Sequence, residues 1–287
     1  MIADLEEKQM VDFKQIRTNI IGNDLAYDFD YGKRDVVYAD WTASGRLYKP
    51  IEEYITDELG PFVANTHTET TLTGTRMTKA YHQAQKIIKR HVNANEDDVI
   101  ISAGFGMTAV INKLQRIMGL RVPELFCSHY SCKKIDKPLV IITHMEHHSN
   151  QITWNECFCD VEIIARGDDG LPDLDHLAEI LENNRERKLK IGSFSGCSNV
   201  TGIITPYGKM ARIMHQYGGL CFVDFAASAP YVEIDMHPAD ELETLDAIFF
   251  SPHKFLGGPG SSGVMIFNKA IYKNKVPDHP GGGTVKW

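Results

Sequence analysis

The sequence has neither a long basic run nor an apolar stretch near its start. Its 30 Lys and Arg residues are outnumbered by 38 Asp and Glu residues, which gives a formal net charge of −8. That balance does not indicate a surface for nucleic acids or anionic membranes. The first ten residues include Asp4, Glu6 and Glu7, so they predict neither a signal peptide nor a membrane anchor. We therefore expect a cytoplasmic protein with a small-molecule partner, no nucleic acid and no membrane.

The cysteines also lack the spacing of a known metal-binding or disulfide pattern. The six cysteines include no C-x2-C pair, and without a secretory signal they are better interpreted as reduced thiols than as a disulfide framework. A zinc site is conceivable from five residues, but their spacing does not match that of strong zinc motifs: Cys127, His129, Cys132, Cys157 and Cys159. We expect no metal.

The chain has 287 residues, 43% of them hydrophobic, which is enough for one large α/β domain or two modest ones. Short β-branched runs alternate with helix-period segments, a pattern typical of a mainly parallel sheet flanked by helices. Strands are predicted at 98–102, 139–143, 161–165, 189–195, 220–224, 247–251 and 264–267. Helices are predicted at 109–118, 173–181 and 206–217. We expect an N-terminal segment over 1–40 and one large domain over 41–287, with a surface insertion near 121–137.

The most informative segment is Ser251-Pro-His253-Lys254, which follows an apolar strand and precedes a glycine-rich turn. A lysine at a strand exit lies where α/β proteins bind ligands, and it can form a Schiff base with an aldehyde cofactor. Ser251 and His253 offer a hydroxyl and an imidazole to a phosphate. A solvated loop lysine is the alternative interpretation.

Asp224 ends another apolar strand, thirty positions before Lys254. Pyridoxal-phosphate (PLP) chemistry needs a carboxylate beside the pyridine nitrogen, because a protonated ring accepts electrons from the reacting amino acid. A helix N-cap is the alternative for this Asp. That alternative does not explain the matching strand that leads to Lys254.

Three further signals follow predicted strands. Gly106, Met107 and Thr108 lead from a predicted strand into the predicted helix at 109–118, so backbone N–H groups and a hydroxyl are expected to bind a phosphate. His147 lies in a His-Met-Glu-His-His segment that lacks the H-E-x-x-H zinc motif, and it could stack on a cofactor ring. Asn199 could donate to the phenolate oxygen of that ring. Together these signals predict a PLP site.

In order along the chain, the motifs Gly-x-Thr, Glu-His-His-Ser-Asn, Ser-Asn, Val-Asp-x-Ala and Ser-x-His-Lys resemble class V aminotransferases, the group that contains cysteine desulfurases and selenocysteine lyases. The segment from Tyr38 to Ser44 resembles that family's Asp-x-Ala segment near the active site. The resemblance implies a fold type I PLP enzyme, a homodimer, with Lys254 as the Schiff-base lysine. It also implies the following roles: Asp224 as the nitrogen partner, His147 as the stacking ring, Asn199 as the O3' contact, and Thr108, Ser251, His253 and Thr284 as phosphate ligands.

The chain departs from the family pattern in two places. Ala227 stands where desulfurases have Gln or His. The family's C-terminal small domain, with the substrate-carboxylate arginine and the sulfur-accepting cysteine, would follow Trp287. Transamination, sulfur or selenium elimination and racemisation therefore stay open, as does a PLP-binding domain or fragment with weak activity. We expect this chain alone to bind PLP but to turn over amino acids poorly, with Arg76 the one present arginine considered as a substitute.

Overall fold

The computed structural model describes residues 12–67, 69–125 and 136–281. The chain forms two compact units. One contains the N-terminal part up to residue 78 together with 254–259, and the other contains 79–253 and the chain from 260 onward. The sequence-based boundary at residue 40 stays a prediction.

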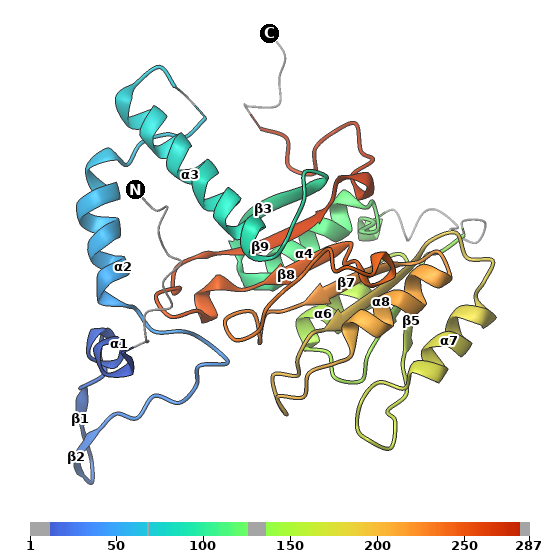
Figure 1. Ribbon diagram of the computed structural model, residues 1–287, viewed down its shortest axis with the longest axis horizontal. Coiled ribbons are helices and arrows are strands. Elements are labelled where there is room, and N and C mark those ends of the chain that lie inside the picture. The colour runs from blue at the N-terminus through green and yellow to red at the C-terminus, as the bar shows by residue number, and fades with distance from the viewer. Residues whose placement is uncertain (1–11, 68, 126–135, 282–287) are drawn as a thin grey trace. The chain divides into compact units, whose positions relative to one another are not determined.

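The N-terminal unit consists of short helices and a hairpin. Asp12 caps its first helix, where Oδ1 accepts hydrogen bonds from the backbone N–H groups of Lys14 and Gln15. The elements are α1 (Phe13–Asn19), β1 (Ala26–Phe29), β2 (Gly32–Asp35), α2 (Lys49–Glu53), η1 (Tyr54–Leu59) and η2 (Gly60–Phe62). Strands β1 and β2 pair antiparallel and are drawn in blue in Figure 1. Helix α3 (Leu72–His91) begins in this unit and ends in the second one.

The second unit is built on a seven-stranded sheet with the order β3-β9-β8-β7-β6-β4-β5. Only β9 runs antiparallel to its neighbours. The strands are β3 (Asp98–Phe105), β4 (Leu139–Ile142), β5 (Asp160–Ile163), β6 (Lys190–Ser195), β7 (Leu220–Asp224), β8 (Ala247–Phe250) and β9 (Ser262–Asn268). The strands are connected by helices α4 (Gly106–Ile117), α6 (His148–Asn155), α7 (Leu174–Asn183) and α8 (Tyr207–Gln216) and by the short turns η4 (Glu241–Glu243) and η5 (Pro252–Lys254). A further short turn, η6 (Lys269–Ile271), follows β9.

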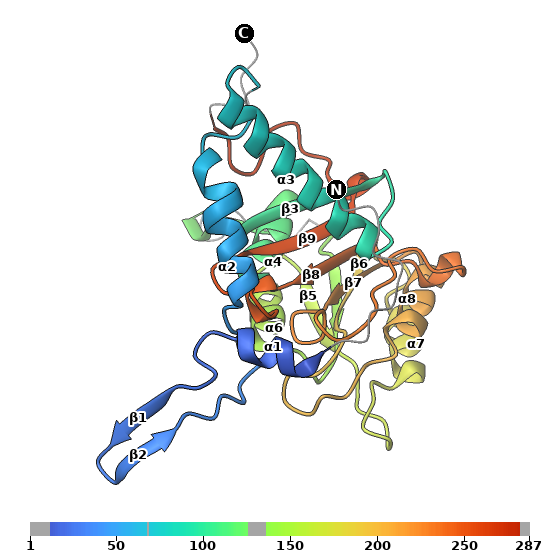
Figure 2. The same ribbon diagram turned by 60° about the vertical axis from the view of Figure 1, so that its left-hand side comes forward.

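The central strands are apolar on both faces because helices cover both sides of the sheet. Every residue of β4 and of β8 is buried. In Figure 2, α4 and α6 lie on one side of the sheet, and α7 and α8 lie on the other. Helices α4, α7 and α8 each bury an apolar stripe, such as Val110, Ile111 and Leu114 of α4, which is the amphipathic pattern of a covering helix.

This architecture confirms the predicted α/β class with a mainly parallel sheet. All seven predicted strands are present, and β7 has the predicted bounds. Strand β3 is three residues longer than predicted, up to Phe105, because its pairing with β9 continues past Ala103 to Phe105 across an irregularity in the register. The hairpin β1–β2 and helices α3 and α6 were not predicted. Ten residues of the predicted surface insertion, 126–135, lie outside the described residues.

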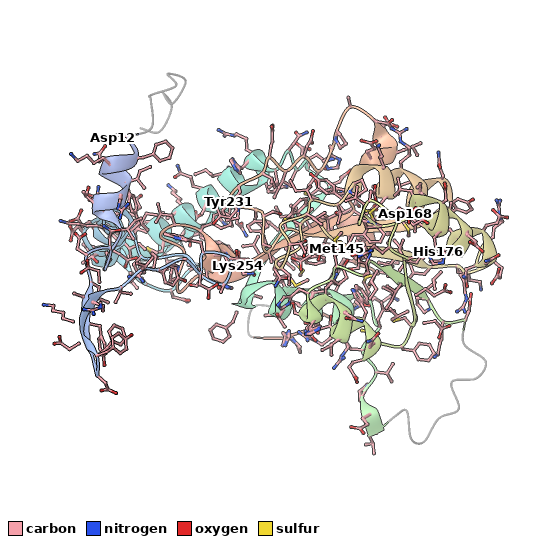
Figure 3. The ribbon with its side chains drawn as sticks, turned by 90° about the horizontal axis from the view of Figure 1, so that it is seen from below. Asp12, Met145, Asp168, His176, Tyr231 and Lys254 are labelled. Atoms are coloured by element: carbon pink, nitrogen blue, oxygen red, sulfur yellow. The ribbon has the colours of Figure 1, made fainter. Side chains whose placement is uncertain are left out.

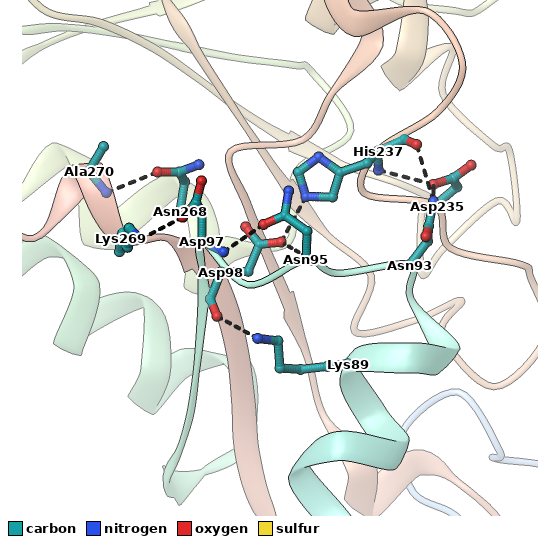
Figure 4. Close-up of polar contacts among 10 residues, drawn as sticks. All are labelled: Lys89, Asn93, Asn95, Asp97, Asp98, Asp235, His237, Asn268, Lys269 and Ala270. Atoms are coloured by element: carbon teal, nitrogen blue, oxygen red, sulfur yellow. Dashed lines mark hydrogen bonds and ion pairs between the residues drawn. The ribbon is translucent and has the colours of Figure 1, made fainter.

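The start of β3 is held by buried polar contacts (Figure 4). The Asp98 carboxylate accepts a 2.7 Å hydrogen bond from the backbone N–H of Asn95 and contacts His237 Nε2 at 2.7 Å. Lys89 Nζ donates to the Asp98 carbonyl oxygen at 2.8 Å. These contacts anchor the amino-terminal end of β3. The carboxyl end of β3 lies at the opposite edge of the sheet, where α4 begins. Within the part of the chain that the structure describes, no helix is long and apolar enough to cross a membrane.

Candidate functional site

The candidate site lies at the edge of the sheet where the parallel strands end. Because β9 is antiparallel to both β3 and β8, those two strands point the same way as β7, β6, β4 and β5. Their carboxyl ends therefore share one edge, which is where open α/β sheets bind ligands. Among the described residues of this second unit, those predicted for the site lie at or directly after these strand ends.

The first turn of α4 lies against the segment that follows β8. The backbone N–H of Met107 donates a 2.8 Å hydrogen bond to Ser251 Oγ, and both residues are buried. Gly106 has φ +64°, and a Cβ atom there would lie 2.9 Å from His253 Cε1 and 3.1 Å from Ser251 Oγ. Glycine therefore allows a backbone conformation and a close approach that a side chain would prevent.

The start of α4 has the features of an anion site. Thr108 is exposed on its first turn, and the first N–H groups of a helix have no partner within the helix. Because Ser251 Oγ accepts from Met107, the Ser251 hydroxyl hydrogen can donate to another acceptor. The structure thus brings together four predicted phosphate-binding positions of the second unit, Gly106, Met107, Ser251 and His253, with Thr108 on the same turn.

Asp224 is the last residue of β7 and is 6% exposed. Its Oδ1 atom accepts a 2.8 Å hydrogen bond from the backbone N–H of Ala226. In the sheet it is paired with Ser195 of β6 on one side and Phe249 of β8 on the other. The backbone of Asp224 is thereby fixed between two neighbouring strands, and this places its carboxylate at the end of the central strand of the sheet.

His147 is the N-cap of α6, immediately after the turn that follows β4. Its Nδ1 atom accepts from the backbone N–H of Ser149 at 3.2 Å and lies 2.7 Å from Ser149 Oγ. A backbone N–H can only donate, so Nδ1 is an acceptor and the proton of the neutral ring lies on Nε2. The exposed ring is therefore oriented by its own helix end.

The remaining predicted residues differ in how the structure places them. Asn199 is exposed in the turn after β6, next to Ser198, whose Oγ accepts from the backbone N–H groups of Val200 and Thr201. Lys254 ends η5, directly after His253 in the chain, and is labelled in Figure 3. It is grouped with the N-terminal unit, so its part in the site is a proposal. Thr284 lies outside the described residues.

Sequence reasoning assigned no role to Glu146, although the residue is the centre of a polar network at the site edge. Its carboxylate oxygens accept hydrogen bonds from Thr143, Asn150 and Ser195. The sequence does show that Glu146 comes four residues after a buried strand, which is a position close to the site edge. The burial of that carboxylate could not be predicted without the neighbouring strand.

The cysteines of the described chain have little thiolate character. Burial raises the pKa of Cys157 to about 11 and that of Cys159 to about 12. Among residues 12–67, 69–125 and 136–281, no three His, Cys, Asp or Glu side chains are grouped so that they could hold a metal ion. Cys127, His129 and Cys132 lie outside the described residues.

The N-terminal unit contains Arg76 and the segment from Tyr38 to Ser44, for which the sequence predicts a part near the active site. The Tyr38 hydroxyl lies 2.7 Å from the Ser44 carbonyl oxygen, which closes the segment predicted to lie near the active site. Tyr38 and Trp41, with Arg46, help to line a cavity of about 750 Å³ in this unit. The guanidinium of Arg76 lies 4.2 Å from the centre of the Phe62 ring, a cation–π contact.

The fold and the site edge define an α/β protein with a buried carboxylate and a helix start that has the features of an anion site. A sequence model of the family described as aminotransferase class-V matches residues 37–287. The chain belongs to this class V aminotransferase family, as its motifs predicted. The family contains proteins of several activities, so membership alone does not fix the reaction.

Several relatives of the chain are named as cysteine desulfurases. The chain is 29% identical over 252 residues to a "Probable cysteine desulfurase" of Halalkalibacterium halodurans, covering 86% of this chain and 57% of the relative. It is 26% identical to one of Pyrococcus abyssi, covering 88% and 58%. The structure resembles the apo cysteine desulfurase of Thermococcus onnurineus NA1 with a TM-score of 0.73 at 22% identity, covering 97% of this chain and 62% of that one. The chain thus spans about three fifths of the length of these proteins.

Proposed function

We propose that this chain is the cofactor-binding part of a PLP-dependent enzyme that acts on an amino acid, with release of sulfur from cysteine as its reaction. The observation that carries the proposal is the meeting of Gly106 and Met107 with Ser251 and His253 at the sheet edge that also holds Asp224. Lys254 follows His253 directly. Family membership and the names of the relatives support the same reading.

The residues present fit PLP by their chemistry. A phosphate needs several donors in a concave backbone, and the Gly106 position is a cradle that a Cβ atom would fill. Met107 orients the Ser251 hydroxyl, and Thr108 offers a second hydroxyl on the same helix turn. The pyridine nitrogen needs a carboxylate, which Asp224 supplies in a buried position.

Each residue has a defined task in this proposal. PLP, when bound, supplies an aldehyde and a ring that accepts electrons from the amino acid. Lys254 would hold the aldehyde carbon covalently, and Asp224 would keep a proton on the ring nitrogen through an ion pair in a site of low dielectric constant. His147 would cover the ring face, and Asn199 would donate its amide hydrogen to the phenolate oxygen.

Transamination is the second candidate, favoured by the family's own description. Desulfuration is favoured by the relatives, which are named as cysteine desulfurases. A homodimer belongs to the same proposal, because the run Gly281–Gly283 followed by Thr284 resembles a loop that lends a phosphate contact to the neighbouring subunit. A cytoplasmic location stays the expectation stated from the sequence.

Covalent labelling tests the cofactor assignment. We expect the purified chain mixed with PLP to show Schiff-base absorbance near the visible edge, and borohydride to fix the label on Lys254, as read by peptide mass spectrometry. Lys254→Ala should lose this absorbance and keep the fold. Lys209→Ala, a matched change at an exposed lysine of α8, should keep it. Normal absorbance in the Lys254 variant would end the assignment.

Product analysis tests the reaction. Incubation of the chain with cysteine, alanine and glutamate, with and without a keto-acid acceptor, separates the two candidates. Alanine formed from cysteine, with its sulfur recovered as sulfide once a thiol reductant is added to the assay, would support desulfuration, whereas keto acid formed only with an acceptor would support transamination. Sedimentation at several concentrations would test the homodimer, which a monodisperse monomer that binds PLP tightly would contradict.

A further inference from the structure

The carboxylate of Glu146 accepts hydrogen bonds from five donor groups. Oε1 accepts from the Thr143 backbone N–H at 3.2 Å, the Thr143 hydroxyl at 2.6 Å and the Ser195 backbone N–H at 2.9 Å. Oε2 accepts from Asn150 Nδ2 at 2.7 Å and from the Ser195 hydroxyl at 2.8 Å. A carboxylate offers about four lone-pair positions, so this one is saturated. The turn that carries it also contains Met145, which is labelled in Figure 3.

Burying the Glu146 carboxylate in this way adds little to the stability of the fold. Burial raises the pKa of Glu146, and the hydrogen bonds from Thr143, Asn150 and Ser195 act against that rise. Within the described chain, no Lys, Arg or His forms an ion pair with this carboxylate, so neutral donors alone compensate its burial. An enclosed charge of this kind is a weak source of stability compared with an apolar residue of similar size. Its presence is better explained by the geometry that it fixes.

The donors come from three elements that meet at the site edge. Thr143 follows β4, Asn150 belongs to α6, and Ser195 is the last residue of β6. Glu146 directly precedes His147, and Ser195 is the strand partner of Asp224. One carboxylate therefore fixes both the turn that presents His147 and the strand end beside Asp224.

Asn150 extends the same network into the core. It is fully buried, and its Nδ2 atom also donates to the Ser193 carbonyl oxygen at 3.1 Å. Its Oδ1 atom accepts from the Ser193 hydroxyl at 2.8 Å and from Trp154 Nε1 at 3.0 Å. Because the indole nitrogen only donates, the orientation of the Asn150 amide is determined. Helix α6 is thus fixed to β6 at its first turn, where His147 is the cap.

We propose that Glu146 is a positioning residue of the cofactor site, which holds His147 and Asp224 at the separation that a bound pyridine ring requires. The inference rests on the proposed function, since it concerns the same site. Glu146 contacts no substrate in this proposal. It acts through the two residues that would cover the ring and contact its nitrogen.

Glu146→Gln tests the inference because it preserves shape and removes an acceptor. Each carboxylate oxygen of Glu146 accepts from at least one N–H group. In either orientation of the glutamine amide, its NH2 group would therefore face an N–H group of the protein, and two donors would meet. We expect the Kd for PLP to rise about tenfold or more. We also expect the visible circular dichroism of the bound cofactor to change, because the ring loses its fixed surroundings. Glu179→Gln, the same change at an exposed position of α7, should alter neither quantity.

Ser195→Ala keeps the test informative if the glutamine variant does not fold. It removes one donor to Oε2 and leaves the backbone N–H in place, so smaller shifts in the same direction are expected. Unchanged Kd and unchanged circular dichroism in folded variants, with only a lower Tm, would overturn the inference. If the unaltered chain binds no PLP, or keeps its Schiff-base absorbance after Lys254→Ala, the proposed function fails instead.

Discussion

The backbone N–H of Met107 donates a 2.8 Å hydrogen bond to Ser251 Oγ, which joins positions 144 residues apart in the chain. Met107 is the second residue of α4, the helix after β3, and Ser251 follows β8. These strands are separated in the sheet only by the antiparallel β9. The bond therefore joins the start of α4 to the segment that leads to His253. Ser251 is expected to accept a hydrogen bond within the protein and to donate one to phosphate.

Ser251→Ala should weaken PLP binding about tenfold, because the buried Met107 N–H loses its acceptor and the phosphate loses a donor. Titration of PLP followed by absorbance measures this change. Ser228→Ala is the matched control, since Ser228 is equally buried and its hydroxyl has no hydrogen-bond partner among the described residues. Equal affinity of the two variants would remove Ser251 from the site.

Gly106→Ala should destabilise the fold and reduce PLP binding together. The added Cβ would lie 2.9 Å from His253 Cε1, in addition to the strain of φ +64° at a residue with a side chain. Gly218 provides the control, because it has φ +67° with no atom within 4 Å of an added Cβ. Urea unfolding should show a loss of about 1 kcal/mol for Gly218→Ala and a larger loss for Gly106→Ala. Equal losses would mean that the close approach at Gly106 carries no cost.

Asp224→Asn should retain the fold and bind PLP more weakly. A neutral amide cannot hold a proton on the ring nitrogen. Where the unaltered chain turns over an amino acid, we expect the variant to do so about 100-fold more slowly, or slower still. The absorbance of the bound cofactor should shift at constant pH. Unchanged turnover and spectrum would point to another nitrogen partner.

Much of the sheet could be predicted because its strands are short apolar runs that end at polar residues. Strand β7 shows this best, since four of its five residues are buried and Asp224 ends it. The hairpin β1–β2 gives no such signal, because seven of its eight residues are exposed and its strands lack alternation. Helix α3 was missed for a related reason, as only Gly74 and Thr78 are buried along its length.

Site residues at strand ends were likewise accessible to sequence reasoning, whereas contacts between strands were not. Asp224 and His253 could be placed at one edge because parallel strands end together. The role of Glu146 depends on Ser195, a residue 49 positions away on the neighbouring strand, so no local pattern reveals it. Tertiary hydrogen bonds of this kind need the register of the sheet.

His215 of α8 forms an ion pair away from the site edge that makes folding stability depend on pH. Its Nε2 atom lies 2.9 Å from Asp246 Oδ2, and its Nδ1 atom lies 2.7 Å from the Leu242 carbonyl oxygen. Both partners are acceptors, so the ring is held with two protons. The hydrogen bond to Asp246 is the main cause that raises the pKa of His215, the Leu242 carbonyl adds to it, and burial acts against both.

The direction of the pH effect follows from this raised pKa. A group with a higher pKa in the folded state binds more protons there than in the unfolded chain, so its contribution is complete below the unfolded value of about 6.5 and is lost as pH rises through the folded value. We expect His215→Ala to lower the free energy of unfolding by about 1 kcal/mol at pH 5.5, a figure reduced for partial exposure. The difference from the unaltered chain should shrink above pH 7, as measured by urea unfolding at a series of pH values. His82→Ala, at an exposed histidine of α3, should show no such trend. A difference for His215→Ala that stays constant from pH 5.5 to 9 would mean that the ring stabilises the fold by packing rather than by its charge.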